Sequence, residues 1–356
     1  MTSIPSDPLR STYTANFPEL LEQLGISLAV TTYQQGKLVL IRSANGQLNT
    51  HFRMFTFPMG IASTAPWLAV GTTREIIEFR NVPAVADSMT SPQQHDACYL
   101  PRCSHVTGEV AVHEMSYCGD ELWFVNTRFS CLATVDRVHN FVPRWRPKFI
   151  SQLVPGDCCH LNGMACDAGQ PRFVTALGSS GVPEGWRETK ASGGVLIDVQ
   201  TGETIVRGLS MPHSPRIAHD TLWVLESGHG SLGYVDVQQG VYHAVVELAG
   251  FTRGLDFCQH YAFVGLSQVR ESTVFSGIEL AERLSADQRR CGIGVIDLHS
   301  GRLVAWLNFE DAVQEIFAVS VLPHRFPDLI NDDLETIGKS YVLPDESLRD
   351  VPARYR

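Results

Sequence analysis

The chain has 356 residues, of which 44% are hydrophobic, so it is long enough for two ordinary domains or for one large closed β-fold. Its 28 basic and 38 acidic residues give a net charge of −10, which argues against nucleic acid or an anionic membrane surface as a partner. No segment approaches the ~20 apolar residues of a membrane span. The N-terminal residues lack the basic and apolar regions of a secretory signal, so we expect a cytoplasmic protein.

The cysteine pattern supports that location. The count of nine is odd, and Cys158 and Cys159 are adjacent in the chain. Both features are typical of free thiols rather than of a disulfide framework. We therefore expect reduced cysteines.

The first residues are predicted to form an arm that contains one short helix. The segment Phe17–Gly25 has apolar residues at helical spacing and ends in glycine. Three strands are predicted next, at Ser27–Thr32, Gly36–Ser43 and Gln47–Phe55. This opening block has one strand fewer than the blocks that follow.

A strand–turn–strand pattern then recurs at intervals of tens of residues. It is clearest in Val112–Arg137 and returns in Arg216–Gly240 and Gly254–Arg302. The first strands of the successive blocks are anchored by apolar residues, namely Ile61, Met115, Met164, Ile217, Leu255 and Phe317. Repetition of one all-β unit at this period is typical of a propeller, and six anchors predict six blades.

The segment Glu315–Leu322 reads as a strand with no later partner, so we expect it to complete the opening block. Such closure removes exposed strand edges, which otherwise promote aggregation. The predicted fold is all-β: a six-bladed β-propeller closed by pairing of the N- and C-terminal strands, with a short N-terminal helix and surface insertions. We assign residues 1–25 to the arm, 26–322 to the propeller and 323–356 to a tail that wraps the outside.

Three segments interrupt the predicted repeat, namely Asn81–Thr107, Ser179–Ser192 and Gln268–Arg290. The last two follow second strands of their blades. The end of a second strand returns to the channel mouth at which the first strand begins, so these two insertions are predicted to form a lid over that mouth. Function concentrates on loops held by a rigid scaffold, and a channel mouth is a natural pocket.

Three histidines stand at the starts of three consecutive blades: His113, His160 and His213. Neutral imidazoles suit zinc and iron, and three of them with one open position form a catalytic geometry. The alternative cation is calcium, held by oxygens of Glu114, Asn162 and Glu315. A purely structural interpretation, in which the histidines bond buried carbonyl groups, stays open.

The remaining polar residues predicted at this mouth divide into catalytic and substrate-binding candidates. Glu114 or Glu315 would act as the base, and Arg253 or Arg216 would hold an anionic group. Trp186 and Arg187 lie on the predicted lid, where an aromatic group and a cation are costly to leave exposed. The further substrate-binding candidates are Asn126, Arg128, Asn162, Arg216, Ser227 and His229.

These residues predict a polar, histidine-containing site for a small molecule. If the protein is an enzyme, metal-assisted hydrolysis or lyase chemistry on a small polar or anionic substrate fits best. The alternative is a non-catalytic propeller module that binds a protein or glycan partner.

The ordered motifs VHEM, LWFVNTRFSCLATVD, FVPRWRPKFIS, HLNGMA, GGVLIDVQTGE, MPHSPR and LWVLESGHGSLGYVD resemble an uncharacterised bacterial family of conserved hypothetical proteins, a domain of unknown function. The resemblance covers most of residues 20–325 and implies no established activity. The family pattern has an acidic residue before the His-Glu pair, whereas this chain has Val112 at that position. More distantly, the architecture is similar to six-bladed propeller lactonases, phosphotriesterases and amidating lyases, which hold a divalent metal on the axis.

Overall fold

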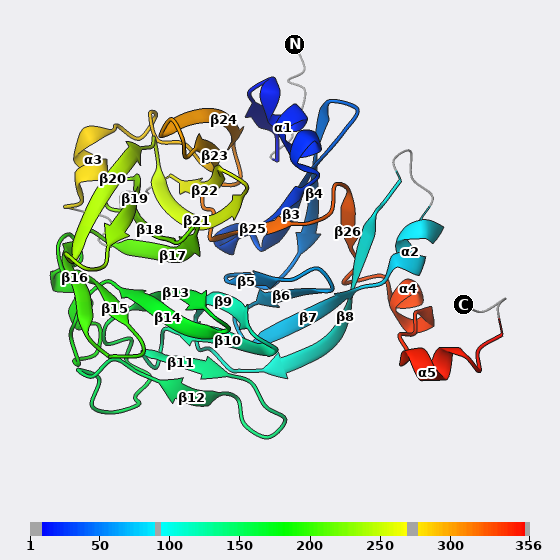
Figure 1. The fold of residues 1–356 in the computed structure, drawn as a ribbon, viewed down its shortest axis with the longest axis horizontal. Coiled ribbons are helices and arrows are strands. Elements are labelled where there is room, and N and C mark those ends of the chain that lie inside the picture. The colour runs from blue at the N-terminus through cyan, green and yellow to red at the C-terminus, as the bar shows by residue number, and fades with distance from the viewer. Residues whose placement is uncertain (1–8, 90–93, 269–276, 353–356) are drawn as a thin grey trace, which may run out of the picture.

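The computed structural model describes residues 9–89, 94–268 and 277–352. Six sheets of four or five strands surround a central axis (Figure 1). The innermost strands of neighbouring sheets contact one another in a closed ring. The predicted all-β, six-bladed propeller is therefore confirmed, and its sheets are numbered here as blades 1 to 6.

The first three blades are each given from the axis outward, and the first two of them include a strand from the C-terminal part of the chain. Blade 1 comprises β25 (Ala318–Leu322), β2 (Ser27–Thr32), β3 (Lys37–Ala44) and β4 (Gln47–Met54). Blade 2 comprises β5 (Ile61–Ser63), β6 (Trp67–Gly71), β7 (Glu75–Asn81), β8 (Ala97–Val106) and β26 (Pro327–Leu329). Blade 3 comprises β9 (Val112–Cys118), β10 (Glu121–Asn126), β11 (Cys131–Thr134) and β12 (Val142–Trp145).

The last three blades follow the same order. Blade 4 comprises β13 (Leu161–Asp167), β14 (Gln170–Ala176), β15 (Gly194–Asp198) and β16 (Thr204–Leu209). Blade 5 comprises β17 (Pro212–Ala218), β18 (Thr221–Glu226), β19 (Ser231–Asp236) and β20 (Val241–Glu247). Blade 6 comprises β21 (Phe251–Cys258), β22 (Tyr261–Ser267), β23 (Gly292–Asp297), β24 (Arg302–Phe309) and β1 (Ser11–Tyr13).

The helices are short and lie outside the sheets. They are α1 (Asn16–Leu24), α2 (Pro83–Ser88), α3 (Glu279–Arg283), α4 (Leu334–Lys339) and α5 (Asp345–Leu348), with 3-10 turns at Tyr33–Gln35 and Gly185–Glu188. None of the described helices is long and apolar enough to cross a membrane.

Strands β25 and β2 close the propeller. They pair antiparallel, with Ser27 opposite Leu322 and Thr31 opposite Ala318. The C-terminal strand thus takes the axial position of blade 1, next to three strands from the N-terminal part of the chain. The predicted closure is confirmed, because the axial strand of blade 1 comes from the far end of the chain.

The hydrophobic core lies between the faces of neighbouring blades. Between blades 1 and 6, for example, Val39 packs in one cluster with Ile293. Helix α1 covers this cluster with Phe17 and Leu21, which are 0% and 1% exposed. Their spacing of four residues places both side chains on one helix face. The arm is therefore joined to the propeller by a shared core.

Hydroxyl groups at the ends of second strands bond to backbone carbonyls at the start of the next blade's inner strand. The donors are Thr31, Thr127, Ser227 and Ser267, and the acceptors are the carbonyls of Met59, Leu161, Thr252 and Ile316. In blade 4, where Leu177 follows the second strand, Asn162 Nδ2 instead donates to the Pro212 carbonyl at 3.0 Å. These bonds fix neighbouring blades relative to one another.

The prediction that Asn81–Thr107 interrupts the repeat is wrong for its second half. Strand β8 fills residues 97–106 and is the fourth strand of blade 2. Pro101 obscured it in the sequence, because proline is disfavoured inside a sheet. The structure accommodates Pro101 opposite Phe79, next to a register shift. Residues 90–93 of this segment lie outside the described chain.

The other two insertions meet in one apolar cluster. Trp186 from the blade 4 insertion, Ile278 and Leu280 from the blade 6 insertion pack with Met211 and Phe251 from the starts of inner strands. The two insertions therefore lie together over one mouth of the channel, and residues 269–276 fall outside the described chain.

One pair of cysteines corrects the prediction that all are free. Cys118 and Cys166 form a disulfide between the ends of inner strands β9 and β13, 48 residues apart in the chain. The other seven cysteines are free. The sequence could not reveal the pair, because only the side-by-side placement of blades 3 and 4 brings the two together.

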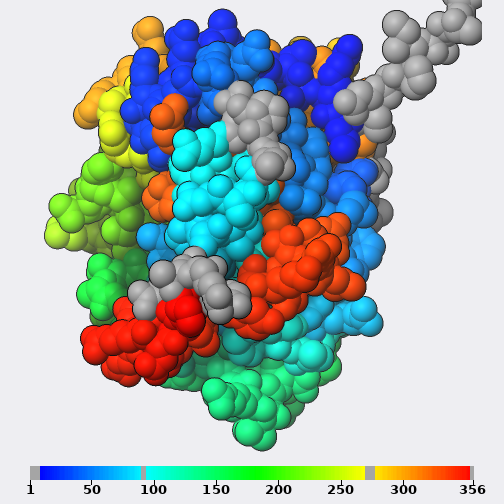
Figure 2. Space-filling model, turned by 90° about the vertical axis from the view of Figure 1, so that its right-hand side faces the viewer, coloured from blue at the N-terminus to red at the C-terminus, as the bar shows by residue number. Residues whose placement is uncertain are grey.

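The C-terminal tail lies on the outer face of blade 2. Strand β26 pairs in parallel with β8, with Pro327 opposite Ala97 and Leu329 opposite Tyr99. Figure 2 shows this tail, orange to red, against the light-blue and cyan surface of blade 2. The tail thus adds a fifth strand to that blade.

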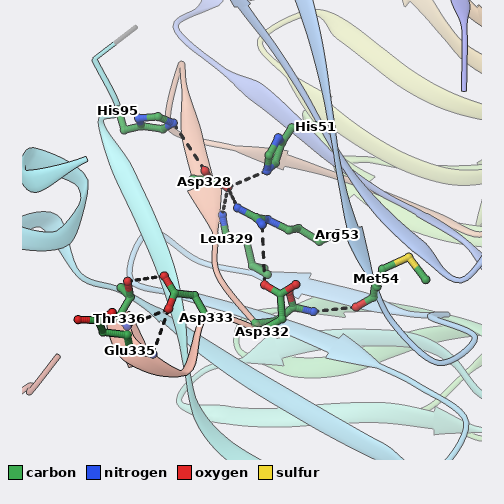
Figure 3. Close-up of polar contacts among 11 residues, drawn as sticks. His51, Arg53, Met54, His95, Asp328, Leu329, Asp332, Asp333, Glu335 and Thr336 are labelled. Carbon is green, nitrogen blue, oxygen red and sulfur yellow. Dashed lines mark hydrogen bonds and ion pairs between the residues drawn. The ribbon is translucent and has the colours of Figure 1, made fainter. Parts of the chain in front are cut away.

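A buried aspartate holds the tail in place. The carboxylate of Asp328 is 2.9 Å from Arg53 Nη2 and 3.2 Å from His51 Nε2, both on β4 of blade 1 (Figure 3). His95 Nε2 lies 3.7 Å from the same carboxylate. Asp332 makes a longer contact of 3.9 Å with Arg53. The tail therefore links blades 1 and 2 at the rim.

Candidate functional site

The starts of the inner strands bring the predicted histidines to one mouth of the channel. We call this the histidine mouth and define it by His113, His160, His213, Arg253 and Phe317. The ring centroids of His113 and His160 are 4.7 Å apart, and those of His113 and Phe317 are 5.1 Å apart. The Arg253 guanidinium carbon stacks 3.4 Å from the Phe317 ring centroid. His113, His160 and Arg253 thus lie together with Phe317, and their assignment to a binding site stays a prediction.

Each of the three imidazoles bonds an oxygen through Nδ1. His113 Nδ1 lies 3.1 Å from the Ala111 carbonyl, and His160 Nδ1 lies 2.8 Å from the Asp157 carboxylate. His213 Nδ1 lies 2.9 Å from the Met211 carbonyl. A carbonyl or carboxylate oxygen only accepts, so Nδ1 carries the proton in each ring. When the rings are neutral, Nε2 is the atom with a lone pair.

Local backbone geometry sets these contacts. Ala111 and Met211 immediately precede β9 and β17 and have φ of 54° and 49°, in the left-handed region. This turn directs their carbonyls to the histidines two residues later. His160 itself has φ of 49° and occupies the turn position before β13, so its imidazole reaches back to Asp157. The three histidines therefore do not occupy equivalent positions in their blades.

Burial keeps His113 and His213 neutral. Burial is the main cause that lowers the pKa of both imidazoles well below the ordinary value. Electrostatic interactions with His160 and Arg253 lower the pKa of His113 further. Arg253 also lowers the pKa of His213. Burial also lowers the pKa of Arg253, to about 10, so the guanidinium stays charged at neutral pH. The mouth therefore combines neutral acceptors with one cation.

This neutrality predicts an acid-sensitive fold. Below about pH 6.5 the unfolded chain binds protons that His113 and His213 in the folded chain do not bind, so stability is lost as pH falls. Each histidine adds at most about 1.4 kcal/mol per pH unit to this slope. Urea unfolding between pH 7 and 5 should show a shallower slope for a His113→Gln/His213→Gln variant than for wild type. Equal slopes would contradict the assignment, and a His219→Gln variant, changed at an exposed histidine, is the control.

Glu315 joins Arg253 at the histidine mouth, where Oε1 of the glutamate is 3.4 Å from Nη1 of the arginine. Arg253 thus has a carboxylate on one side and the Phe317 ring beneath it. The predicted roles of Glu315 as a base and of Arg253 as an anion-binding group stay predictions.

Trp186, for which the sequence predicted contact with a ligand on the lid, is 2% exposed in the protein itself. Its ring centroid lies 4.4 Å from that of His160, and Nε1 donates to the Asp157 carboxylate at 3.2 Å. Contacts with the two insertions supply the burial that a ligand was predicted to supply. Through Asp157, Trp186 orients His160.

Three predicted substrate-binding residues are buried in internal hydrogen bonds. Asn126 and Ser227 are 0% exposed, and Asn162 is 2% exposed. Asn126 Oδ1 accepts from the Phe129 N–H, and Asn162 and Ser227 link neighbouring blades as described above. In this conformation they present no surface to a substrate.

Three other candidates lie at more exposed positions. Arg128 pairs with Glu109 at 3.8 Å, and Arg187 stacks on Trp186 with 4.7 Å from its guanidinium carbon to the ring centroid. His229 contacts Glu226 and Glu279, at 3.0 and 3.1 Å. Substrate contact by these three residues stays a prediction.

Glu114 and Arg216 lie deeper in the channel. Arg216 Nη2 donates to Glu114 Oε1 at 2.7 Å, and the glutamate residue is 4% exposed. Arg216 and Asp256 also line a cavity of about 200 Å³ at the far ends of the inner strands. We expected Glu114 and Arg216 to face the strand-start mouth, and the structure differs from this expectation. The strand register shifts between His213 and Arg216, which places Arg216 farther along the channel.

Sequence reasoning missed three residues that shape the channel. Phe317, treated only as an anchor, supports Arg253; Asp157 orients His160; and Asp256 lines the axial cavity. Burial raises the pKa of Asp256, against the lowering effect of Arg216. A useful signal was available for Asp157, because it lies three residues before His160 in the turn that precedes an inner strand.

Residues 15–330 match the family model described as Domain of unknown function (DUF4915). The chain belongs to this family. The match confirms the resemblance to an uncharacterised family that the ordered motifs indicated. No curated protein matches the sequence.

Two solved structures share the fold of this DUF4915 protein. A chain of the nidogen/laminin complex aligns with a TM-score of 0.54 at 8% identity, over 84% of this chain and 100% of that one. A protein of unknown function from Bacteroides caccae aligns with a TM-score of 0.51 at 10% identity, over 84% of this chain and 99% of that one. At these identities the likeness shows the propeller fold alone.

The histidine mouth matches a metal site in one respect and differs in another. An Nδ1–H bonded to oxygen is the usual outer contact of a metal-binding imidazole. However, the ligand atoms of the three histidines do not lie within 4.8 Å of one another. Among the described residues, Glu78, Cys103 and His105 form the group that meets this distance. As arranged here, the histidine mouth does not converge on one ion.

The calcium alternative also lacks an assembled site. Glu114 is paired with Arg216, and Asn162 Oδ1 accepts from Thr175 at 2.8 Å. Their oxygens are therefore engaged within the protein rather than turned together with Glu315.

Proposed function

We propose that the histidine mouth binds a small polar molecule that carries both a hydroxyl or amine donor and an anionic group. The observation that carries the proposal is the common orientation of the imidazoles: every Nδ1 is bonded to oxygen, which leaves Nε2 as an acceptor in the neutral ring. Donor groups of the ligand would bond these nitrogens. Its anionic group would lie against Arg253, which stays charged at neutral pH.

The test is binding of small probes to wild-type protein, measured by saturation-transfer NMR at pH 7.5. Glycolate, malate and glycine carry both required groups, whereas acetate lacks the donor group and γ-butyrolactone lacks both groups. We expect transfer to at least one of the first three, and its loss in His113→Ala and Arg253→Met variants. The His219→Gln variant, changed at an exposed histidine that is not a site candidate, should bind as wild type does.

Failure of all three probes, or binding that survives in Arg253→Met, would contradict this proposal. Thermal melts must show that both mouth variants are folded. Proteins with intact Arg253 could bind acetate and glycolate equally well. In that case the histidines would contribute no specificity, and the requirement for a donor group on the ligand would be wrong.

A second candidate is metal-assisted hydrolysis or lyase chemistry, which the outer contacts of the three histidines favour. A zinc or iron ion would polarise a substrate oxygen, and His113, His160 and His213 would hold it after rotation of their rings. Elemental analysis of tag-free wild type and of a triple His→Ala variant tests this candidate. One ion per chain that is lost in the triple variant would support it and justify a screen of lactones and esters.

Absence of both small-probe binding and mouth-bound metal would favour the non-catalytic alternative, a propeller module for a protein or glycan partner. We further propose a cytoplasmic location, which the seven free cysteines support. The Cys118–Cys166 disulfide is the observation against it, because such bonds are rare in reducing compartments.

A further inference from the structure

A second group of metal-binding side chains lies on blade 2, away from the channel. In the antiparallel pair of β7 and β8, Glu78 lies opposite Cys103, and Ile76 lies opposite His105. Alternate residues of a strand point to the same side, so Cys103 and His105 share one face of the sheet with Glu78. Glu78 Oε1 is 3.1 Å from His105 Nε2, and the three donor atoms all lie within 4.8 Å of one another.

The neighbouring blade positions the carboxylate of this group. Tyr117, on inner strand β9 of blade 3, donates its hydroxyl to Glu78 Oε2 at 2.8 Å. One carboxylate oxygen is thereby fixed by an outer contact, and the other is directed to His105. Outer contacts of this kind orient the ligands of metal sites.

Open space adjoins the group. Cys103 and His105 line a cavity of about 540 Å³ whose other wall is the loop of residues 136–140 between β11 and β12. Asn140 Nδ2 donates to the Val106 carbonyl at 2.8 Å and ties this loop to the end of β8. The free thiol of Cys103 is exposed. An ion therefore has a path to the group, and a further ligand has room beside it.

We propose that Glu78, Cys103 and His105 form a binding site for a divalent transition metal, with zinc as the preferred ion. A thiolate, an imidazole and a carboxylate are the three ligand types that zinc accepts, whereas magnesium and calcium disfavour sulfur. Tetrahedral zinc with bonds of about 2.0–2.3 Å separates its donors by roughly 3.3–3.8 Å. The observed contacts approach this spacing, so small side-chain rotations assemble the site.

The fourth position of the ion faces the cavity and takes water or an exogenous ligand. In the metal-free protein the contact between His105 and Glu78 is a hydrogen bond in which Nε2–H donates. On metal binding the Cys103 thiol loses its proton, and the imidazole proton moves from Nε2 to Nδ1 as Nε2 binds the ion, so one proton is released. Affinity for the metal should consequently fall as pH falls.

Cobalt titration of the reduced full-length protein tests this site, because cobalt reports thiolate coordination through a charge-transfer absorption band. We expect one equivalent of Co²⁺ per chain, displaced by Zn²⁺. Cys103→Ser should abolish the band, and His105→Ala should weaken binding at least tenfold. Tyr117→Phe, which removes only the outer contact, should weaken it about 10- to 100-fold.

Two controls separate this site from the rest of the molecule. Cys258→Ser, at a partly buried free thiol of blade 6, and the triple His→Ala variant of the histidine mouth should both keep the band at full intensity. A band that persists in Cys103→Ser, or that disappears in the mouth variant, would overturn the proposal. Titration without a stoichiometric end point would show adventitious surface binding only, and would overturn it as well.

Discussion

The Asp328→Ala variant is expected to lose about 3–5 kcal/mol of unfolding free energy, because it removes a buried carboxylate and leaves the largely buried Arg53 without its nearest partner. Asp328 is 4% exposed and joins the tail to Arg53 and His51 of blade 1 (Figure 3). Arg42 reinforces the join by donating to the Pro327 carbonyl. Urea unfolding followed by circular dichroism measures the loss, and limited proteolysis should show earlier cleavage of the tail.

The matched control is Asp332→Ala. Asp332 contacts the same arginine at 3.9 Å, but its side chain is 73% exposed. Exposed pairs contribute about 1 kcal/mol or less, so this variant should unfold almost as wild type does. Equal losses in the two variants would show that burial of Asp328 does not decide the energy.

The contribution of Asp328 should also depend on pH. Burial raises its pKa, but hydrogen bonds from His51 and Arg53 outweigh burial and leave that pKa below its ordinary range. A carboxylate with a lowered pKa stabilises the fold above about pH 3.9, and this stability is lost as pH falls further. The difference between wild type and Asp328→Ala should therefore narrow in strong acid.

The Glu114→Ala variant is the second change with a large expected effect, again about 3–5 kcal/mol. It removes the carboxylate that accepts from Arg216 at 2.7 Å inside the channel. Arg216 cannot turn fully to solvent, since its side chain is only 22% exposed. Chemical unfolding at pH 7 measures the cost.

Removing both partners should cost less than removing one. A Glu114→Leu/Arg216→Leu variant leaves no buried charge of this pair, and such replacements are often neutral or stabilising. Glu203→Ala, which breaks the exposed pair with Lys148, should unfold almost as wild type does. A double variant as unstable as the sum of its single changes would contradict the ion-pair interpretation.

The strands and their grouping into blades follow from local patterns in the sequence. Apolar and β-branched runs between turn residues located first strands near Met115, Met164 and Leu255, and the structure has inner strands there. Ring closure was also predictable, because the opening block lacked one strand and Glu315–Leu322 lacked a partner. Strand β8 was the exception, since Pro101 broke the pattern that a strand usually shows.

The histidine mouth was predictable only in outline. The start of an inner strand reaches the mouth in every blade, so the positions of His113, His160 and His213 followed from the repeat alone. Their Nδ1 contacts depend on left-handed turns at Ala111, His160 and Met211, which the sequence does not mark with glycine. The separation of their ligand atoms likewise depends on how far each ring reaches across the axis.

The remaining features were decided by the tertiary structure. The Glu114–Arg216 pair joins residues 102 positions apart, and the Cys118–Cys166 disulfide joins the ends of neighbouring inner strands. The Glu78, Cys103 and His105 group needs the register of β7 against β8. Local patterns determine where strands begin and end, because these limits depend on the backbone preferences of residues within each strand. Contacts between distant residues depend on register, twist and blade packing, which only the complete ring sets.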